Sequence, residues 1–142
     1  MALAIDIADA VAAELAGGTF PQEISPVRRV LPDFELADLR DLRVTVVPKV
    51  VEITGSTRTL CQHDVQIDIG VQKKLGTDLD VEVAELCGLV EEIAAFLKKR
   101  PLAAAPHASW VRTANEPIYA PDHLSDQRVF TSVLTLTYRA LS

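Results

Sequence analysis

A long amphipathic stretch in the second half of the chain constrains the fold more than any other feature. Apolar residues recur at steps of three and four between residues 77 and 100, which predicts a helix with one apolar face. That face consists of Leu79, Val83, Leu86, Leu89, Val90, Ile93, Phe96 and Leu97. Because a helix gains most of its stability from packing of such a face, this one needs a sheet or other helices to cover it.

The residues at the two ends of this helix are typical of helix termini. Thr77 followed by Asp80 resembles a capping box in which an acid replaces the usual Glu or Gln. The cations at 98–100 suit the last turn, and Pro101 ends the helix. Gly88 costs about 1 kcal/mol relative to alanine in a helix interior. We therefore expect Gly88 to lie where the helix packs closely against a strand.

Three segments around this helix predict the strands of a sheet. Apolar and polar residues alternate over 59–74, which predicts a strand with one packed and one exposed face. This strand exceeds the usual length of roughly five to six residues, so we expect it to project from the body as part of a hairpin arm. Residues 44–52 and 129–141 are rich in β-branched residues and predict two further strands. Pro48 cannot donate to a ladder, so its strand lies at an edge or is bulged there.

The N-terminal third of the chain is less regular. Residues 3–16 predict a helix with a narrow apolar stripe, which we place at the margin of the core. Prolines interrupt residues 19–43 and indicate an extended path. Within that path we expect one strand at 27–31 and a short helical turn at 33–42.

The segment between the long helix and the last strand carries no clear periodicity. Residues 102–109 predict a linker and 110–128 a loop, because Pro117 and Pro121 disfavour regular structure. The elements together predict an α+β fold, in which a small, mainly antiparallel sheet with a long hairpin packs against two helices. The length of 142 residues suits a single domain spanning 1–142.

Composition excludes several classes of function. A net charge of −6 leaves no basic stripe to neutralise phosphates, which argues against nucleic-acid binding. No apolar run reaches the roughly 18 residues of a membrane span, so we expect no membrane partner. The first residues lack the basic region of a secretory signal. Two cysteines suit a reducing compartment, which favours folding in a cytoplasm.

The sequence shows no catalytic or metal-binding signature. Cys61 and His63 could share one strand face, but a metal site would need two further ligands, so we expect no metal and no cofactor. The carboxylates of the long helix are typical of a solvated face. An alternative hypothesis is a small cytoplasmic enzyme or ligand-binding domain, with a pocket between sheet and long helix. Its candidate residues would be Cys61, His63 and Cys87.

Surface features instead favour an interaction protein. The predicted tip of the hairpin arm offers polar side chains, and aromatic residues near the C-terminal part are typical of interface anchors. The candidate interface residues are Thr54, Gly55, Ser56, Thr57, Arg58, Trp110, Ile118 and Tyr119. An equally good interpretation of Trp110 is that it caps the core.

Four phrases of the sequence resemble a group of small virion proteins of tailed phages and prophages. They are LRVTVVPK (42–49), QHDVQIDIGVQKKL (62–75), GLVEEIAAFLKKRPL (88–102) and YAPDHLSDQRVFTSVLTLTYRAL (119–141). The order of elements also resembles the tail-terminator and neck proteins of long-tailed phages. The resemblance covers about residues 27 to 141. It rests on these sequence segments and on the order of elements, and not on a catalytic signature.

The resemblance implies a structural function. A tail terminator assembles as a homohexameric ring that caps the tail tube, ends its polymerisation and docks the head connector. Its partners would be copies of itself, the tail tube protein and the connector or stopper protein, with DNA only passing through the lumen. It would be located in the virion, at the tail or neck, after assembly in the host cytoplasm. A head–tail connector or other neck protein is the alternative within this group.

Overall fold

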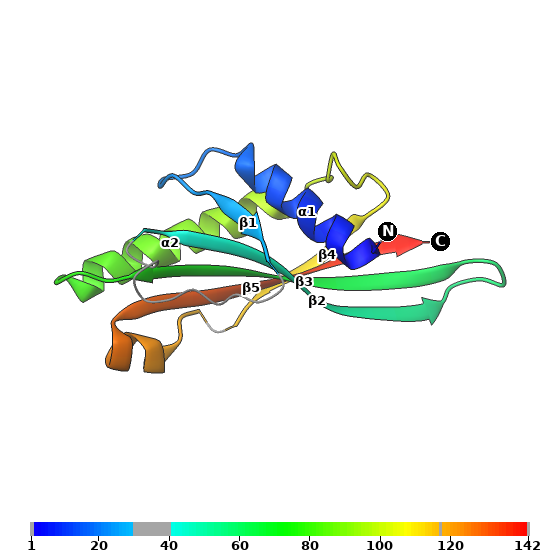
Figure 1. Ribbon diagram of the computed structural model, residues 1–142. Helices are drawn as coiled ribbons and strands as arrows, with labels where there is room; N and C mark the ends of the chain where they lie inside the picture. The colour runs from blue at the N-terminus through cyan, green and yellow to red at the C-terminus, as the bar shows by residue number, and fades with distance from the viewer. Residues whose placement is uncertain (1, 30–40, 117, 142) are drawn as a thin grey trace.

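The computed structural model describes residues 2–29, 41–116 and 118–141, without the side chains of residues 126 and 127. The described segments form one five-stranded sheet with two α-helices on the same face (Figure 1). In chain order the elements are α1 (Leu3–Ala16), β1 (Pro26–Arg28), β2 (Arg43–Gly55), β3 (Cys61–Lys74), α2 (Leu79–Leu97), β4 (Ser109–Asn115), the π-helix η2 (His123–Gln127) and β5 (Val129–Leu141). This arrangement confirms the predicted α+β class.

The sheet is mainly antiparallel, as predicted. Its strand order is β1-β2-β3-β5-β4, and β1 alone runs parallel to its neighbour. The short β1 confirms the described part of the strand predicted at 27–31. The helical turn predicted at 33–42 falls mostly on residues that lie outside the described part of the chain.

The hairpin of β2 and β3 contains the irregularity that Pro48 predicts. Pro48 pairs with Ile67 and Val50 pairs with Gln66, so Lys49 is an extra residue that forms a β-bulge. Residues that face each other across a ladder point to the same side of the sheet. The helix-covered side, which we call the inner face, therefore receives the side chains of Val44, Val46, Pro48, Val51 and Ile53 from β2.

Helix α2 packs its predicted apolar face on the sheet. Leu86, Leu89, Val90, Ile93 and Leu97 are buried. The cap differs from the prediction, because the Asp78 side chain, and not Thr77, accepts a hydrogen bond from the Val81 N–H. The helix also ends before the cations at 98–100, since Lys99 has a left-handed φ of 58°.

Gly88 is not a close-packing residue, contrary to the prediction. A Cβ added at Gly88 would meet no atom within 4 Å. The residue instead lies on a side of α2 that opens to a surface cavity. Its presence therefore weakens the helix without serving the packing of the core.

Helix α1 is more central than its narrow stripe predicts. Its side chains at Ile7, Val11 and Leu15 are fully buried, at 0% exposure. The helix packs against β1, β2 and β3, whereas α2 contacts β5. Alanines at Ala8 and Ala10 are also buried, which allows the close approach of this helix to the strands.

The segment predicted as a loop at 110–128 contains a strand and a short helix. Residues 109–115 form β4, which pairs antiparallel with β5 at the edge of the sheet. Pro117 and Pro121 follow β4 and do not interrupt it. Further along, η2 is a single turn that leads into β5. The strand predicted at 129–141 is confirmed as β5.

A set of contacts that we call the helix clasp joins α1 to the end of α2. Glu14 accepts hydrogen bonds from Arg100 Nε and from the Ala103 N–H, each at 3.0 Å. The Ala103 N–H and then Arg100 lower the pKa of Glu14. Arg100 lies 4.0 Å from the centroid of the Phe96 ring, which meets Phe20 edge-on at 5.2 Å. The clasp fixes the two helices over the body of the sheet.

Candidate interaction surface

The β2–β3 hairpin extends beyond the helices and forms a projecting arm (Figure 1). Residues 49–61, which we call the arm, are all exposed. Strand and helix geometry explains the projection. The 14 residues of β3 span about 46 Å at roughly 3.3 Å per residue. The 19 residues of α2 span only about 28 Å. Neither α2 nor the shorter α1, with 14 residues, therefore spans the whole hairpin. The predicted projection is confirmed (Figure 1).

The predicted tip residues Thr54–Arg58 lie at the far end of this arm. The tip is closed by the Ser56 and Thr57 N–H groups, which donate to the Leu60 carbonyl at 3.1 Å. Thr57 Oγ1 accepts a further bond from the Leu60 N–H at 3.1 Å. The tip is a structured turn with exposed side chains, which suits a contact with another molecule.

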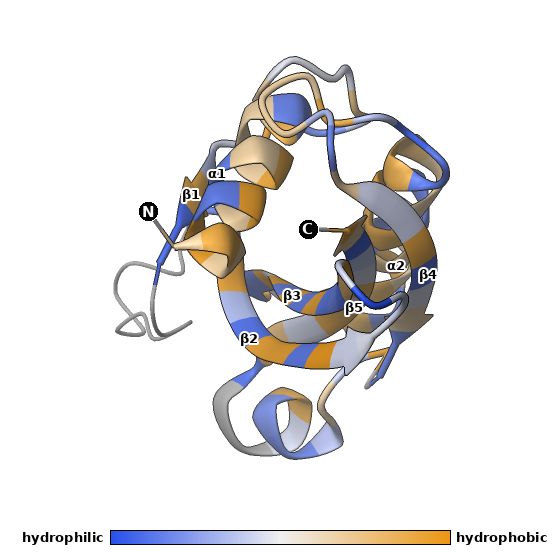
Figure 2. Ribbon diagram, turned by 90° about the vertical axis from the view of Figure 1, so that its right-hand side faces the viewer, coloured by the Kyte–Doolittle hydropathy of each residue, from blue (hydrophilic) through white to orange (hydrophobic). Residues whose placement is uncertain are grey.

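The inner face of the arm is apolar but uncovered. Val51 pairs with the fully buried Val65, yet Val51 is 41% exposed, and Ile53 is 61% exposed. Figure 2, in which the arm points toward the viewer, shows hydrophobic and hydrophilic bands alternating along β2. The core pattern thus continues into the arm without a helix above it. Adjacent exposed apolar side chains of this kind are typical of interaction sites.

The opposite, outer face carries a polar ladder at the base of the arm. Arg139 Nε donates to Asp64 Oδ1 at 2.9 Å, and this bond lowers the pKa of the Asp64 carboxyl. Thr135 Oγ1 donates to Asp68 Oδ1 at 2.7 Å. These cross-strand pairs hold β3 to β5 on the outer face.

Glu52 places a second carboxylate beside this ladder. It lies directly across from Asp64 in the β2–β3 register. Like charges at opposed positions disfavour a strand pair. Within the described part of the chain, Glu52 takes part in none of the ion pairs. A cation supplied by another molecule would therefore find an acceptor here.

The structure separates the predicted interface residues into three places. Trp110 lies on β4, opposite Tyr138, half-buried against the core, with its Nε1 donating to Thr113 Oγ1 at 2.8 Å. This packing favours the core-capping interpretation of Trp110. Ile118 and Tyr119 are 58% and 40% exposed, next to the start of β5. They lie at the opposite end of the sheet from the arm tip.

A groove runs between α2 and the edge strand β4. It encloses about 450 Å³ and has apolar side chains on its floor with two cations among its lining residues. The lining residues are Ala94, Ala95, Lys98, Trp110, Arg112, Thr113, Asn115 and Leu134. Because β4 is last in the strand order, its outer edge has no strand partner among the described residues.

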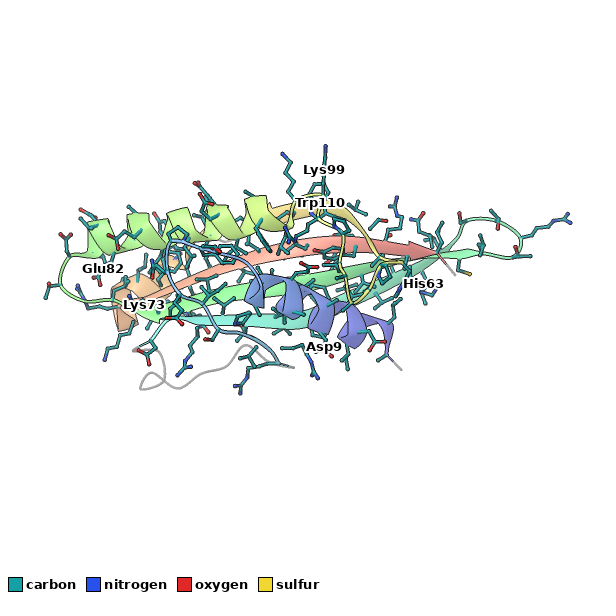
Figure 3. The ribbon with its side chains drawn as sticks, turned by 90° about the horizontal axis from the view of Figure 1, so that it is seen from above. Asp9, His63, Lys73, Glu82, Lys99 and Trp110 are labelled. Atoms are coloured by element: carbon teal, nitrogen blue, oxygen red, sulfur yellow. The ribbon has the colours of Figure 1, made fainter. Side chains whose placement is uncertain are left out.

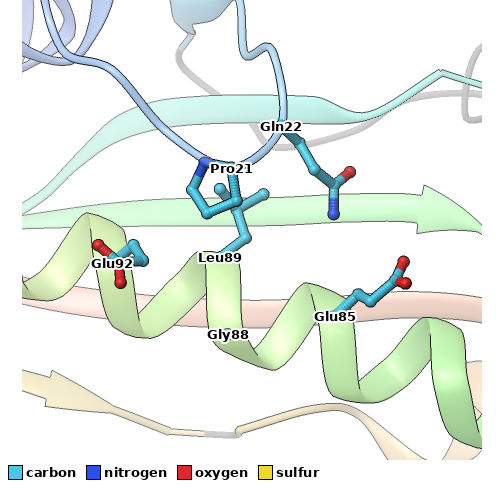
Figure 4. Close-up of a pocket in the computed structure, with 6 residues that line it drawn as sticks. All are labelled: Pro21, Gln22, Glu85, Gly88, Leu89 and Glu92. Atoms are coloured by element: carbon cyan, nitrogen blue, oxygen red, sulfur yellow. The ribbon is translucent and has the colours of Figure 1, made fainter.

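A second cavity lies on the other side of α2, below the loop that follows α1. Glu85 and Glu92 flank Leu89, and Pro21 lies above Leu89 (Figure 4). The two carboxylates are seven residues apart on one helix, which separates their backbones by about 10 Å along the axis. No Ser, Thr, Cys or Lys side chain lies among the lining residues. The cavity offers acidic, solvated surface.

The residues of the alternative pocket hypothesis do not converge. Cys61 begins β3 on the exposed arm. His63 lies near the arm, at the opposite end from Lys73 and Glu82 (Figure 3). Cys87 lies about 1.4 turns beyond Glu82 on α2. No group of three or more His, Cys, Asp or Glu side chains in the described ranges could hold a metal ion.

Comparison with known proteins does not identify a family for this chain. No family model matches the sequence, and no curated protein matches it either. Among the described residues, no helix is long and apolar enough to cross a membrane.

The functional candidates that sequence reasoning missed are Val51, Ile53 and the groove beside β4. The excess length of the strand at 59–74 over the helix could have indicated an uncovered apolar face. The groove had no such signal, since β4 itself was not predicted.

Proposed function

We propose that this protein is a tail terminator of a tailed phage or prophage, which forms a ring on the end of the tail tube. In this role it ends tube polymerisation, docks the head connector and lets DNA pass through its lumen. The protein would assemble in the host cytoplasm and remain in the virion. The proposal rests on the resemblance in sequence and element order, and the arm supports it.

The structural observation that best supports the proposal is the arm with its uncovered inner face. Val51 and Ile53 continue the core pattern into solvent, where burial of their apolar surface by a partner would be favourable. A ring is built from head-to-tail contacts, in which one surface of a subunit meets a different surface of the next. A projecting arm at one end of the sheet suits such a contact.

Light scattering across a concentration series, with negative-stain images of the largest species, tests this proposal. We expect closed rings of about six subunits. Rings of about twelve would instead indicate the head–tail connector. A protein that stays monomeric and also ignores purified tail tubes would contradict both roles.

Shortening the arm tests its part in assembly. We expect replacement of Thr54–Arg58 by a two-residue turn to leave the fold intact, because every residue of this tip is exposed. Circular dichroism would verify the fold, and light scattering would show loss of rings. Full assembly of the shortened protein would contradict a role for the tip.

A further inference from the structure

We infer that the arm of one copy docks as an added strand on the free edge of β4 in the next copy, with Val51 and Ile53 entering the groove between α2 and β4. This inference rests on the proposed ring and names the two surfaces that would form it. The occupant of the groove is thus a second copy of this chain.

Among the described residues, neither edge has a strand partner where the contact requires one. On β2, the parallel neighbour β1 pairs only with Val44–Val46, so within the described chain the edge beyond Pro48 has no strand partner. The β2 residues of the arm from Val50 to Gly55 match the length of β4, Ser109–Asn115. Free edges of similar length can join by main-chain hydrogen bonds, as in strand addition.

The direction of the strands and their faces also agree. The topology makes β2 antiparallel to β4 within one subunit. A neighbour whose sheet continues in the same orientation therefore presents its β2 antiparallel to β4, with its inner face on the same side. Val51 and Ile53 then point toward Ala94 and Ala95 of α2, which line the groove.

Charge complementarity supports this occupant. Glu52 lies on the outer face of the arm beside Asp64, a like charge. The groove contributes Lys98 and Arg112, which are both exposed. Arg112 lies opposite Thr137 on the outer face of the sheet, the same face as Glu52. Docking would bring Glu52 of one copy to Arg112 of the next.

Disulfide cross-linking tests the contact directly. In a background with Cys61→Ser and Cys87→Ser, Ala114→Cys is held fixed on the outer face of β4. A second cysteine is placed in turn at positions 50, 51, 52, 53 and 54. Opposed strand residues bring their Cβ atoms close enough for a disulfide. We expect disulfide-linked oligomers, seen as a ladder of bands on a non-reducing gel, from positions 50, 52 or 54, which share the outer face. Positions 51 and 53 should give at least tenfold less of this product.

A matched control replaces Ala114→Cys by Ala13→Cys, on the exposed side of α1. We expect no ladder from this pair at any arm position. Rings that form without ladders from Ala114→Cys would overturn the docking site while leaving the proposed function intact. A chain that forms neither rings nor ladders would overturn both.

Charge reversal provides an independent readout. We expect Glu52→Arg or Arg112→Glu alone to weaken association by about tenfold or more, measured by light scattering. The double variant should recover most of that loss, which a purely structural role of either residue would not produce. Failure of the double variant to recover association, with circular dichroism unchanged, would overturn the pairing of these two residues.

Discussion

Strands β2 and β3 pass through two regions, the body and the arm, with the same alternating pattern and opposite outcomes. In the body, Ile67 and Ile69 are fully buried under the helices. In the arm, Ile53 occupies the same face and is 61% exposed. The strand sequence alone does not decide burial. The difference arises because helices of limited length cover only part of a longer sheet.

The largest expected effect separates an isoleucine of the body from one of the arm. Ile67→Ala should lower the free energy of unfolding by about 2–5 kcal/mol, since it leaves a cavity beneath the helices. Ile53→Ala should change it by less than about 0.5 kcal/mol, because the side chain is mostly exposed. Urea denaturation at low protein concentration measures both. Similar losses at the two positions would mean that the arm is covered within one subunit.

The next comparison concerns the effect on stability of adding a Cβ at two glycines, one beside the helix clasp and one at the arm tip. A Cβ at Gly18 would lie 2.8 Å from Phe20 Cε2 and 2.9 Å from Phe96 Cζ. Gly18→Ala should therefore cost about 1–3 kcal/mol through displaced rings. At Gly55 no atom lies within 4 Å of the added Cβ, so Gly55→Ala should stay within about 0.5 kcal/mol. Thermal unfolding would check both, and an insensitive Gly18 would argue against a tightly packed clasp.

Substitution of Gly88 tests whether a side chain can be added to the exposed side of α2 without loss of stability. Gly88→Ala should stabilise the protein by about 1 kcal/mol, because alanine favours the helix and the added Cβ meets no neighbour. Urea denaturation gives the sign of the effect. A loss of stability here would indicate that something packs against this side of α2.

The smallest effect concerns pH and again compares the clasp with the base of the arm. The folded-state pKa values of Glu14 and Asp64 are both lowered. Ionised Glu14 therefore stabilises the fold above its unfolded pKa of about 4.3, and this contribution is lost as the pH falls through the lowered value. Glu14→Gln should remove about 0.2–1 kcal/mol at pH 7 and flatten the decline in stability below about pH 4.3.

Unfolding measured from pH 3 to pH 7 would check this, with Asp64→Asn as the matched variant at the base of the arm. The largest contribution to the lowered pKa of Asp64 comes from the side chain of Arg139. For Glu14 the largest contribution comes from the backbone N–H of Ala103. Unchanged pH dependence in Glu14→Gln would show that the clasp carboxylate contributes nothing to acid sensitivity.

Most regular elements were predictable because their patterns are local. The periodic stripe of α2 and the alternation in β3 appear directly in the sequence, and the bounds of α1 and β5 were predicted correctly. Strand β4 was missed because seven residues at a sheet edge need little alternation, and their partner β5 lies beyond two prolines. The depth of α1 was underestimated, since three apolar side chains are enough when alanines beside them allow close approach.

The candidate site was predictable only in part. The polar turn at Thr54–Arg58 is a local feature and lies where the sequence predicts. The exposure of Val51 and Ile53 depends on where the helices end, which is a property of the packed molecule. The prediction that Gly88 packs closely against a strand was wrong for the same reason. Its surroundings depend on a loop that is far away in the sequence.

The bulge at Lys49 controls two properties of the arm that are easily confused. If Lys49 paired regularly, every later side chain of β2 would switch to the other face of the sheet. Val51 and Ile53 would then point away from the helix-covered side. Deleting Lys49 would keep that parity and remove only the local bend and added twist of the strand. If the arm docks on the next copy as proposed, this bend would help to set the angle between successive subunits. A single inserted residue would then determine whether the copies close into a ring or grow as an open filament.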